Sequence, residues 1–329
     1  MAGDSTAPWV RAAGLAVGYL ADHLLGDPRR WHPVAGFGRT AAALERRSYR
    51  DDRVAGAVHT AVLVGAATGL GIAADRLTRT RPVARTLVTA AATWAVLGGR
   101  SLGREAAAVG ALLDAHDLPG ARRRITHLVG RDPATLDEAG IARACVESVA
   151  ENTSDAVVAP LVWGSVAGVP GLLAYRAVNT LDAMIGHRSP RYRRFGWAAA
   201  RLDDLANLVP ARLAAGLTAV LAPLVGGTPR GAWRAVLRDA GAHPSPNAGP
   251  VEAAFAGALG RTLGGVNTYG DEVEDRGTLG DGPPPGAADI ARATRLSALV
   301  GVGALVLAVA AAAGRFGGSG AGGPNLPVP

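Results

Sequence analysis

Long apolar runs without charge decide what this chain can fold into. The clearest run, Leu296 to Ala313, carries no charged residue, and Val54 to Ala74 contains only His59 as a titratable group. A helix needs about 20 mostly apolar residues to cross a bilayer. Shorter or interrupted runs are Trp9–Leu25, Val83–Leu97, Ala156–Ala174 and Leu213–Gly226. The sequence therefore predicts an all-α, polytopic integral membrane protein with four to six membrane-embedded helices, at least two of them broken, short or re-entrant.

The basic residues exclude some reaction types and some classes of binding partner. All 34 are Arg, because the sequence contains no Lys, and this excludes a Walker A loop and a Schiff-base mechanism. They form short clusters between apolar runs rather than one stripe with interleaved aromatic residues, so we expect a lipid bilayer as partner and no nucleic acid. The single cysteine, Cys145, excludes an internal disulfide and any zinc site with two Cys ligands.

The chain divides by composition into four parts of one membrane domain, residues 1–329. We expect N-terminal membrane helices in 1–102, a polar active-site block with an embedded apolar segment in 103–212, C-terminal membrane helices and loops in 213–316, and a disordered tail in 317–329. Gly103–Asn152 has amphipathic period and charge, which predicts a helical loop region, and Thr135–Glu138 matches a capping box that opens a helix. Stretches rich in Gly and Pro, Gly241–Pro250 and Gly264–Gly286, are expected to be loops.

Three carboxylates form the strongest functional pattern. Glu147, Glu151 and Asp155 are spaced i, i+4, i+8, which places them on one helix face, with Asn152 beside them. Like charges so spaced repel by a few tenths of a kcal/mol per pair, roughly, so a bound cation would stabilise them. The pattern indicates a magnesium site or a general-base pair, and the alternative is a solvated acidic face at a helix end.

A second pattern combines acids, amides and arginines. Asn179 and Asp182 share a helical face with Tyr175, an Arg-rich segment that includes Arg194 follows, and then come Arg201, Asp203 and Asp204. Such arginines hold phosphates in bidentate fashion, and the alternative is a positive loop facing the membrane.

Two short segments add weaker candidates. Asp22, Asp27 and His32 lie at the end of the first apolar run, where ionisable groups are functional candidates and also ordinary caps or turns. Near the other end, a proline-stiffened loop from His243 to Pro250 presents Asn247.

Eight strings together resemble the cobinamide-phosphate synthase family of cobalamin biosynthesis, known as CobD or CbiB. They occur in the family's order and cover most of the chain from about Gly18 to Gly265. The strings are Asp22–Pro28 with His32–Pro33, Val129–Asp132, Val146–Asp155, Ala159–Leu161, Tyr175–Asp182, Phe195–Asp204, Pro210–Arg212 and His243–Gly249. The apolar segments are unusually rich in Ala, and the polar stretch Gly270–Gly286 has no close match.

The resemblance implies ATP-dependent amide bond formation between the propionate of adenosylcobyric acid and aminopropanol or its O-phosphate. It implies ATP and Mg²⁺ as cofactors, a corrinoid substrate, and a multi-pass protein of the inner or plasma membrane whose active loops face the cytoplasm. On this basis Glu147, Glu151 and Asp155 are catalytic candidates, and Glu151, Asp155 and Asp182 are metal candidates. The ligand-binding candidates are Arg131, Asn152, Asn179, Arg194, Arg201, Asp203, Asp204, Asp22, Asp27, His32 and Asn247.

Two other function classes stay open at this point. A transporter would use Asp22, Glu147 and Asp182 as an ion relay, although no inverted repeat is visible. A non-catalytic partner would organise other corrinoid enzymes at the membrane, and the family is distantly related to AmpE-type membrane proteins. The sequence decides neither the oligomeric state (a homo-oligomer or a complex with other corrinoid enzymes) nor whether the amine donor is phosphorylated.

Overall fold

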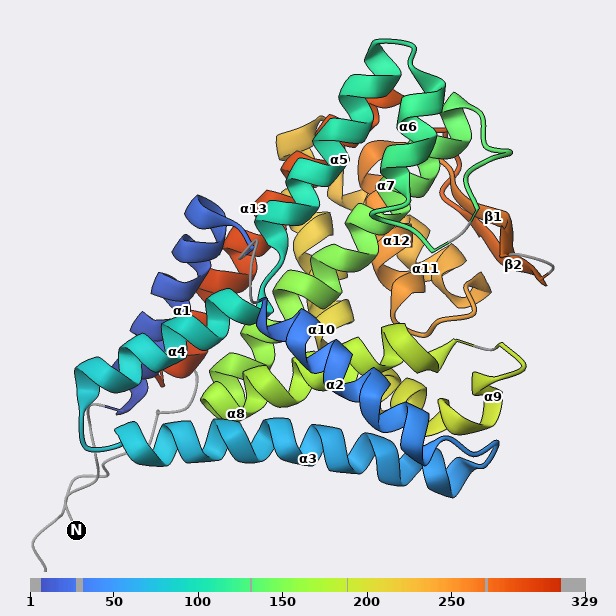
Figure 1. Cartoon of the computed structure of the whole chain (residues 1–329). Coiled ribbons are helices and arrows are strands. Elements are labelled where there is room, and N and C mark those ends of the chain that lie inside the picture. Colours follow the sequence, from blue (N-terminus) through green and yellow to red (C-terminus); the bar gives the residue numbers. More distant parts are fainter. Residues whose placement is uncertain (1–6, 28–31, 131, 188, 270–271, 315–329) are drawn as a thin grey trace, which may run out of the picture.

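A computed structural model describes residues 7–27, 32–130, 132–187, 189–269 and 272–314 (Figure 1). Within them the chain is almost entirely helical, as predicted. The α-helices are α1 (Ala7–Leu25), α2 (Pro33–Ser48), α3 (Arg53–Thr78), α4 (Pro82–Val96), α5 (Gly99–Asp114), α6 (Leu118–Ile125), α7 (Glu138–Thr153), α8 (Ala159–Leu181), α9 (Tyr192–Phe195), α10 (Trp197–Leu221), α11 (Pro229–Asp239), α12 (Ala248–Leu259) and α13 (Ala287–Ala312). Two π-helical segments, Ser154–Val158 and Asp182–Gly186, and two 3₁₀ segments, Ala222–Val225 and Ala240–Ala242, join some of them.

Four helical stretches are long and apolar enough to cross a membrane. They are α3, the run from Glu138 to Gly186, the run from Trp197 to Val225, and α13. This number agrees with the lower end of the predicted range. Along α3, Val54, Val58 and Val62 leave more than half of their surface exposed at i, i+4 and i+8, so one apolar stripe faces outward. Such a stripe is suited to lipid.

Helix pairs pack closely through small residues. In Figure 1, α3 lies beneath α8 and runs alongside it. A Cβ atom added at Gly71 of α3 would lie 2.6 Å from the Pro170 Cα atom of α8, which leaves no room for a side chain. Small residues allow backbones to approach this closely in membrane proteins. Elsewhere α1 packs on α4, and α13 packs on α1, α5 and α7 around the main apolar core.

Helix α8 is broken in the middle, as its prolines predict. Gly168 adopts φ 62° inside the helix, two residues before Pro170. The break frees carbonyl groups that a continuous helix would pair. Arg11 of α1 donates from Nη1 to the carbonyls of Ser165 and Val166, at 3.1 Å each. A cation from another helix therefore caps the first half of α8.

Two local expectations were wrong. The segment expected as a loop, Gly264–Gly286, contains an antiparallel hairpin of β1 (Leu263–Tyr269) and β2 (Glu272–Leu279), whose backbone pairing outweighs its many glycines. Helix α7 does begin at Glu138, but its cap is Asp137, which accepts from the Gly140 N–H at 2.8 Å, so Thr135 is not the capping residue. An Asp side chain caps as well as a Thr side chain.

The end of the hairpin is tied to α11 by a charged pair. Asp239 accepts from the Gly280 N–H at 2.8 Å and binds Arg238 in bidentate fashion. The hydrogen bonds from Arg238 lower the pKa of the Asp239 carboxyl. The carboxylate therefore keeps its charge, and this anchor, as the pH falls below the usual range of an aspartate.

We predict that Gly168→Ala lowers the stability of the fold. At φ 62° and ψ −145° the Gly168 backbone lies near a region that essentially only Gly adopts, where an L-residue costs about 1–3 kcal/mol. The midpoint of thermal unfolding in detergent should fall measurably. Gly69→Ala on α3 is the matched control, because nothing lies within 4 Å of a Cβ atom there and the backbone is helical. Equal midpoints for Gly168→Ala and the wild type would contradict the proposed strain.

Candidate functional site

Both predicted acids at the ends of the apolar segment lie in π-helical turns. Asp155 belongs to the π segment that joins α7 to α8, and Asp182 to the π segment that follows α8. A π turn inserts one residue into a helix and rotates the side chains that follow it, and such turns occur frequently at functional sites. Here the insertions bring residues from both ends of α8 toward the same part of α10.

Asn179 joins the carboxylate of Asp155 to a carboxylate of α10, that of Asp203. Its Nδ2 lies 3.2 Å from Asp155 Oδ2 and 3.4 Å from Asp203 Oδ1 of α10. Asn207, one helical turn beyond Asp203, donates to Asp203 Oδ2 at 2.9 Å. The buried Tyr175 hydroxyl connects the same groups, because its oxygen lies 2.9 Å from Asn207 Oδ1 and 3.0 Å from the Asp155 carbonyl oxygen, and its single proton is donated to one of these two acceptors. The π segment, α8 and α10 are thus held together by polar side chains.

Further acids surround this network. Glu151 interacts electrostatically with Asp155, Asp182 and Asp203. Asp204 interacts in the same way with Asp182 and Asp203. Like charges at a partly buried site repel, and a bound cation would relieve that repulsion. We call this group of residues the acidic cluster; its members are Glu151, Asp155, Asn179, Asp182, Asp203 and Asp204.

A half-buried arginine, Arg176, adjoins the acidic cluster. Arg176 donates from Nη1 to Asn179 Oδ1 at 3.1 Å, and its Nε donates to the Val96 carbonyl at 2.8 Å. Val96 is the last residue of α4, where unpaired carbonyls and the helix dipole favour a cation. Arg176 thereby fixes which way the Asn179 amide faces, with its nitrogen toward the carboxylates.

The predicted loop residue Asn247 also reaches the acidic cluster. Its Nδ2 donates to the Asp204 carbonyl at 2.8 Å, and its Oδ1 accepts from Arg212 at 2.7 Å. The Asp204 carboxylate accepts from Arg201 at 3.1 Å. The structure therefore brings Arg201, Asp204 and Asn247 together, although they are up to 46 positions apart in the sequence.

The donor atoms of the acidic cluster fit a hard cation. Within the described residues, no three His, Cys, Asp or Glu side chains are already arranged as metal ligands. Mg²⁺, however, keeps several waters and is usually held by one or two carboxylates together with substrate phosphates. Asp155 and Asp203 offer carboxylate oxygens on either side of Asn179, and Asp182 interacts electrostatically with both.

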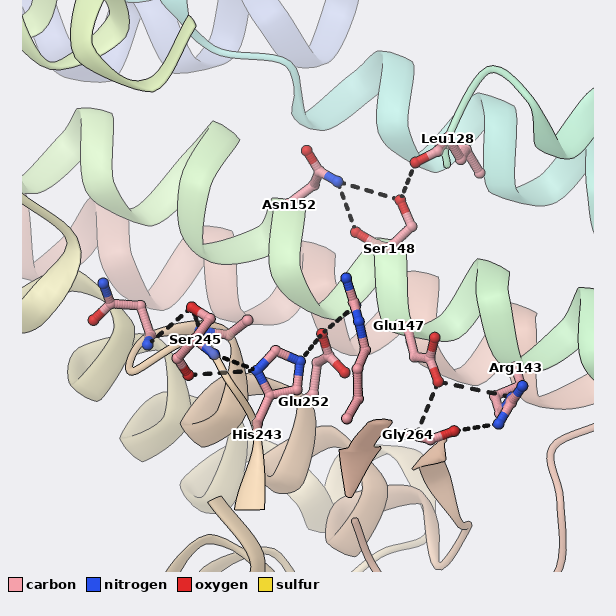
Figure 2. A network of polar contacts seen from close by, with 12 residues as sticks. Leu128, Arg143, Glu147, Ser148, Asn152, His243, Ser245, Glu252 and Gly264 are labelled. Atoms are coloured by element: carbon pink, nitrogen blue, oxygen red, sulfur yellow. Dashed lines mark hydrogen bonds and ion pairs between the residues drawn. The ribbon is translucent and has the colours of Figure 1, made fainter. Parts of the chain in front are cut away.

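Glu147 points away to a different partner. Its carboxylate accepts from the backbone N–H of Gly264 at 2.9 Å and lies 3.9 Å from Arg143 Nε (Figure 2). Arg143 in turn donates to the Gly264 carbonyl. The Glu147 side chain is almost fully buried. This contact holds the start of β1 against α7, so the geometry gives Glu147 a structural partner, while its catalytic role stays a prediction.

Four other predicted residues lie apart from the acidic cluster. Asn152 donates to the carbonyl and the hydroxyl of Ser148. His32 caps α2 by accepting from the Val34 N–H at 3.2 Å. Arg194 lies 4.0 Å from Asp51, and Asp22 accepts from the Arg100 N–H at 3.2 Å. Asp27 interacts electrostatically with Arg176, whereas Arg131 lies outside the described residues.

Sequence reasoning missed three polar residues of this region. Asn207 is four positions after Asp203 on the same helix. The i, i+4 spacing could therefore have indicated that the two side chains are neighbours. Arg176 is three positions before Asn179 on α8, a spacing that sequence reasoning did not use, and its other partner, the Val96 carbonyl, comes from a distant part of the sequence. Glu252 is fully buried on α12, 3.7 Å from His243 and 3.8 Å from Arg276, and sits inside an apolar run that resembles plain core (Figure 2).

Comparison with known proteins gives consistent matches. A family model described as CobD/Cbib protein matches residues 15–297. The chain is 59% identical over 300 residues to Cobalamin biosynthesis protein CobD of Mycobacterium tuberculosis, which covers 91% of this chain and 95% of that protein. Proteins of the same name from Geobacter metallireducens and Chromobacterium violaceum are 48% and 46% identical, over 80% and 86% of this chain and 84% and 90% of their own lengths. No solved structure matches.

We predict that Glu147→Gln loosens the hairpin. A hydrogen bond from a backbone N–H to a charged group is stronger than one to a neutral amide, by an amount that corresponds to about tenfold in local opening. Hydrogen–deuterium exchange of the Gly264 amide should therefore accelerate by about that factor. Glu138→Gln, the same change on the exposed first turn of α7, should leave it unaltered. Unchanged exchange in Glu147→Gln would show that the hairpin is held by other contacts.

Proposed function

Because this chain belongs to the CobD/CbiB family of cobalamin biosynthesis, we propose that it is a membrane-bound, ATP-dependent amide synthase. It joins the propionate side chain of adenosylcobyric acid to (R)-1-amino-2-propanol or its O-phosphate. The product is adenosylcobinamide or its phosphate. The observation that supports this reaction best is the acidic cluster, where Asn179 connects Asp155 to Asp203.

The reaction needs activation of a carboxylate. ATP transfers its terminal phosphoryl group to the propionate, which gives an acyl phosphate and ADP. The amine nitrogen then attacks the acyl carbon and the C–N bond forms; inorganic phosphate leaves with the electrons of the broken C–O bond and takes up one N–H proton of the amine. A proton leaves the attacking ammonium group before the attack. The chain must therefore position phosphates through a cation and accept one proton.

The acidic cluster supplies both requirements. Asp155, Asp182 and Asp203 would hold Mg²⁺, which neutralises phosphate charge when ATP is bound. Glu151 is the base, since it lies within electrostatic reach of Asp155 and Asp203. Asn179 and Asn207 act as positioning residues, because their amides orient the two flanking carboxylates.

Cations near the rim of the cluster suit the phosphates. Arg201 donates to the Asp204 carboxylate and Arg212 donates to Asn247 Oδ1. Guanidinium groups bind phosphate in bidentate fashion.

The protein would lie in the cell membrane with the acidic cluster open to the cytoplasm, since ATP is supplied there. Its partners are the corrinoid substrate, the amine donor and the lipid bilayer, and either further copies of the chain or other corrinoid enzymes.

We predict that Asp155→Asn and Glu151→Gln each lower synthase activity about a hundredfold or more, the usual loss when a positioned catalytic group is removed. Activity is measured in membranes or nanodiscs with adenosylcobyric acid, aminopropanol phosphate, ATP and Mg²⁺, by mass spectrometry of the corrinoid product and by ADP release. Asp114→Asn, an exposed aspartate at the end of α5, is the matched control and should keep wild-type activity. Full activity in Glu151→Gln would remove Glu151 from its role as the base.

A transporter is the second candidate, because several acids of the cluster lie within stretches apolar enough to span a membrane. An uptake assay in proteoliposomes, run beside the ADP measurement, separates the two functions. Substrate-dependent ADP release with product and without uptake supports the synthase. Uptake without product formation would overturn the synthase proposal.

A further inference from the structure

A second polar site borders the π segment that carries Asp155, through Val157. A cavity of about 350 Å³ opens between α1, α5, α13 and that segment. This volume is in the range of small-molecule sites, roughly 300–1,000 Å³, and is small for a corrin ring with its side chains. Its polar lining includes Tyr19, Asp22, His23, Arg100, Arg104 and Ser297.

Asp22 is the distinctive group in this cavity. Only 4% of the residue is exposed. One carboxylate oxygen, Oδ2, accepts from the Arg100 N–H at 3.2 Å and so caps the start of α5. The other oxygen, Oδ1, is buried and has no hydrogen-bond partner among the described residues. A cap explains the first oxygen only, and leaving a buried acceptor unpaired is unfavourable. Oδ1 therefore points to a ligand that donates a hydrogen bond.

The charges around Asp22 define the rest of that ligand. Arg100 and Arg104 are four residues apart on α5, so both side chains reach the same face of the helix and line the cavity. In the described part of the chain, neither has an ion-pair partner. One carboxylate and two guanidinium groups leave the lining with a net charge of +1 when His23 is neutral.

We propose that this cavity binds a short amino-alkyl phosphate, with its ammonium group on Asp22 and its phosphate on Arg100 and Arg104. The ammonium group is a positively charged hydrogen-bond donor. It would therefore supply the partner that Asp22 Oδ1 does not have among the described residues. A phosphate ester carries about −1.5 to −2 at neutral pH, so the whole ligand has a net charge near −1 and complements the lining. A free amine or a free phosphate would satisfy only one end of the site.

Two sources supply this chemistry. One is a soluble amine donor: Val157 lines the cavity two residues after Asp155, and Ser297 is joined to Thr153 by a hydrogen bond of 2.6 Å, so the cavity adjoins the acidic cluster. The other is a phosphoethanolamine lipid headgroup, because α1 exposes Leu20 and Leu24 on either side of Asp22. The binding site itself does not depend on the reaction proposed for the acidic cluster.

The test is binding without ATP or turnover. The full chain is placed in nanodiscs of phosphatidylglycerol and titrated by calorimetry with O-phosphoethanolamine, ethanolamine and inorganic phosphate. We expect O-phosphoethanolamine to bind at least about tenfold more tightly than either half, and Asp22→Asn and Arg104→Gln each to weaken it by about tenfold or more. Asp114→Asn on the same α5 is the matched control and should bind like the wild type. Thermal unfolding verifies that each variant is folded.

A second arm distinguishes the sources. The titration is repeated in nanodiscs that contain phosphatidylethanolamine. Affinity unchanged from the first arm assigns the site to a soluble ligand, whereas a loss through competition assigns it to the lipid headgroup, and both outcomes support the ligand chemistry. No binding of O-phosphoethanolamine in phosphatidylglycerol would overturn the proposal, as would equal binding by folded Asp22→Asn and Arg104→Gln. If a variant still binds O-phosphoethanolamine but has no synthase activity, the result bears on the reaction proposed for the acidic cluster and leaves the binding site supported.

Discussion

Backbone carbonyls that lose their partners where helices end or break have to be paired inside an apolar fold, and arginine side chains supply that pairing here. Arg11 serves the break in α8, Arg176 the end of α4, and Arg292 donates to the Val225 and Leu259 carbonyls, where a 3₁₀ segment and α12 end. Each of these cations comes from a different helix than the carbonyl it binds. The arrangement of the broken helices thus depends on contacts between helices, and the guanidinium group, with its five donors, is suited to make them.

The acidic cluster is built on the same scaffold. Arg176 pairs the end of α4 and at once orients Asn179, and Asn179 holds Asp155 and Asp203. A residue that stabilises the packing therefore also sets the geometry of the candidate site. The two π turns complete it, because each rotates an acid at one end of α8 toward α10. Repulsion among the gathered carboxylates opposes folding and favours cation binding, which is the property that a phosphate-handling site needs.

The predicted acids have different surroundings in the fold, and their spacing in the sequence did not indicate this difference. Glu147, Glu151 and Asp155 are evenly spaced along the sequence, yet Glu147 holds the hairpin through Gly264 while Glu151 and Asp155 interact with each other. The arginines divide similarly. Arg201 lies beside the acidic cluster, whereas Arg194 lies near Asp51, away from the cluster. Family membership agrees with the overall pattern, and the contacts decide which members of the pattern adjoin one another.

The helical, membrane-spanning class followed from the amino-acid sequence, since uncharged runs such as Leu296–Ala313 are stable as helices in lipid or in an apolar core. The sequence also indicated the break in α8 through its prolines, and the candidate acids through helical spacing, because both properties are local. The fold was needed to show that Arg176 connects the end of α4 to those acids, that Asn247 binds the Asp204 carbonyl, and that Glu147 lies apart from them. These relations depend on which helices meet and on single-residue π insertions, and a helical period of 3.6 residues carries no information about either. The hairpin at Leu263–Leu279 likewise forms through pairing across a turn that glycine-rich composition conceals.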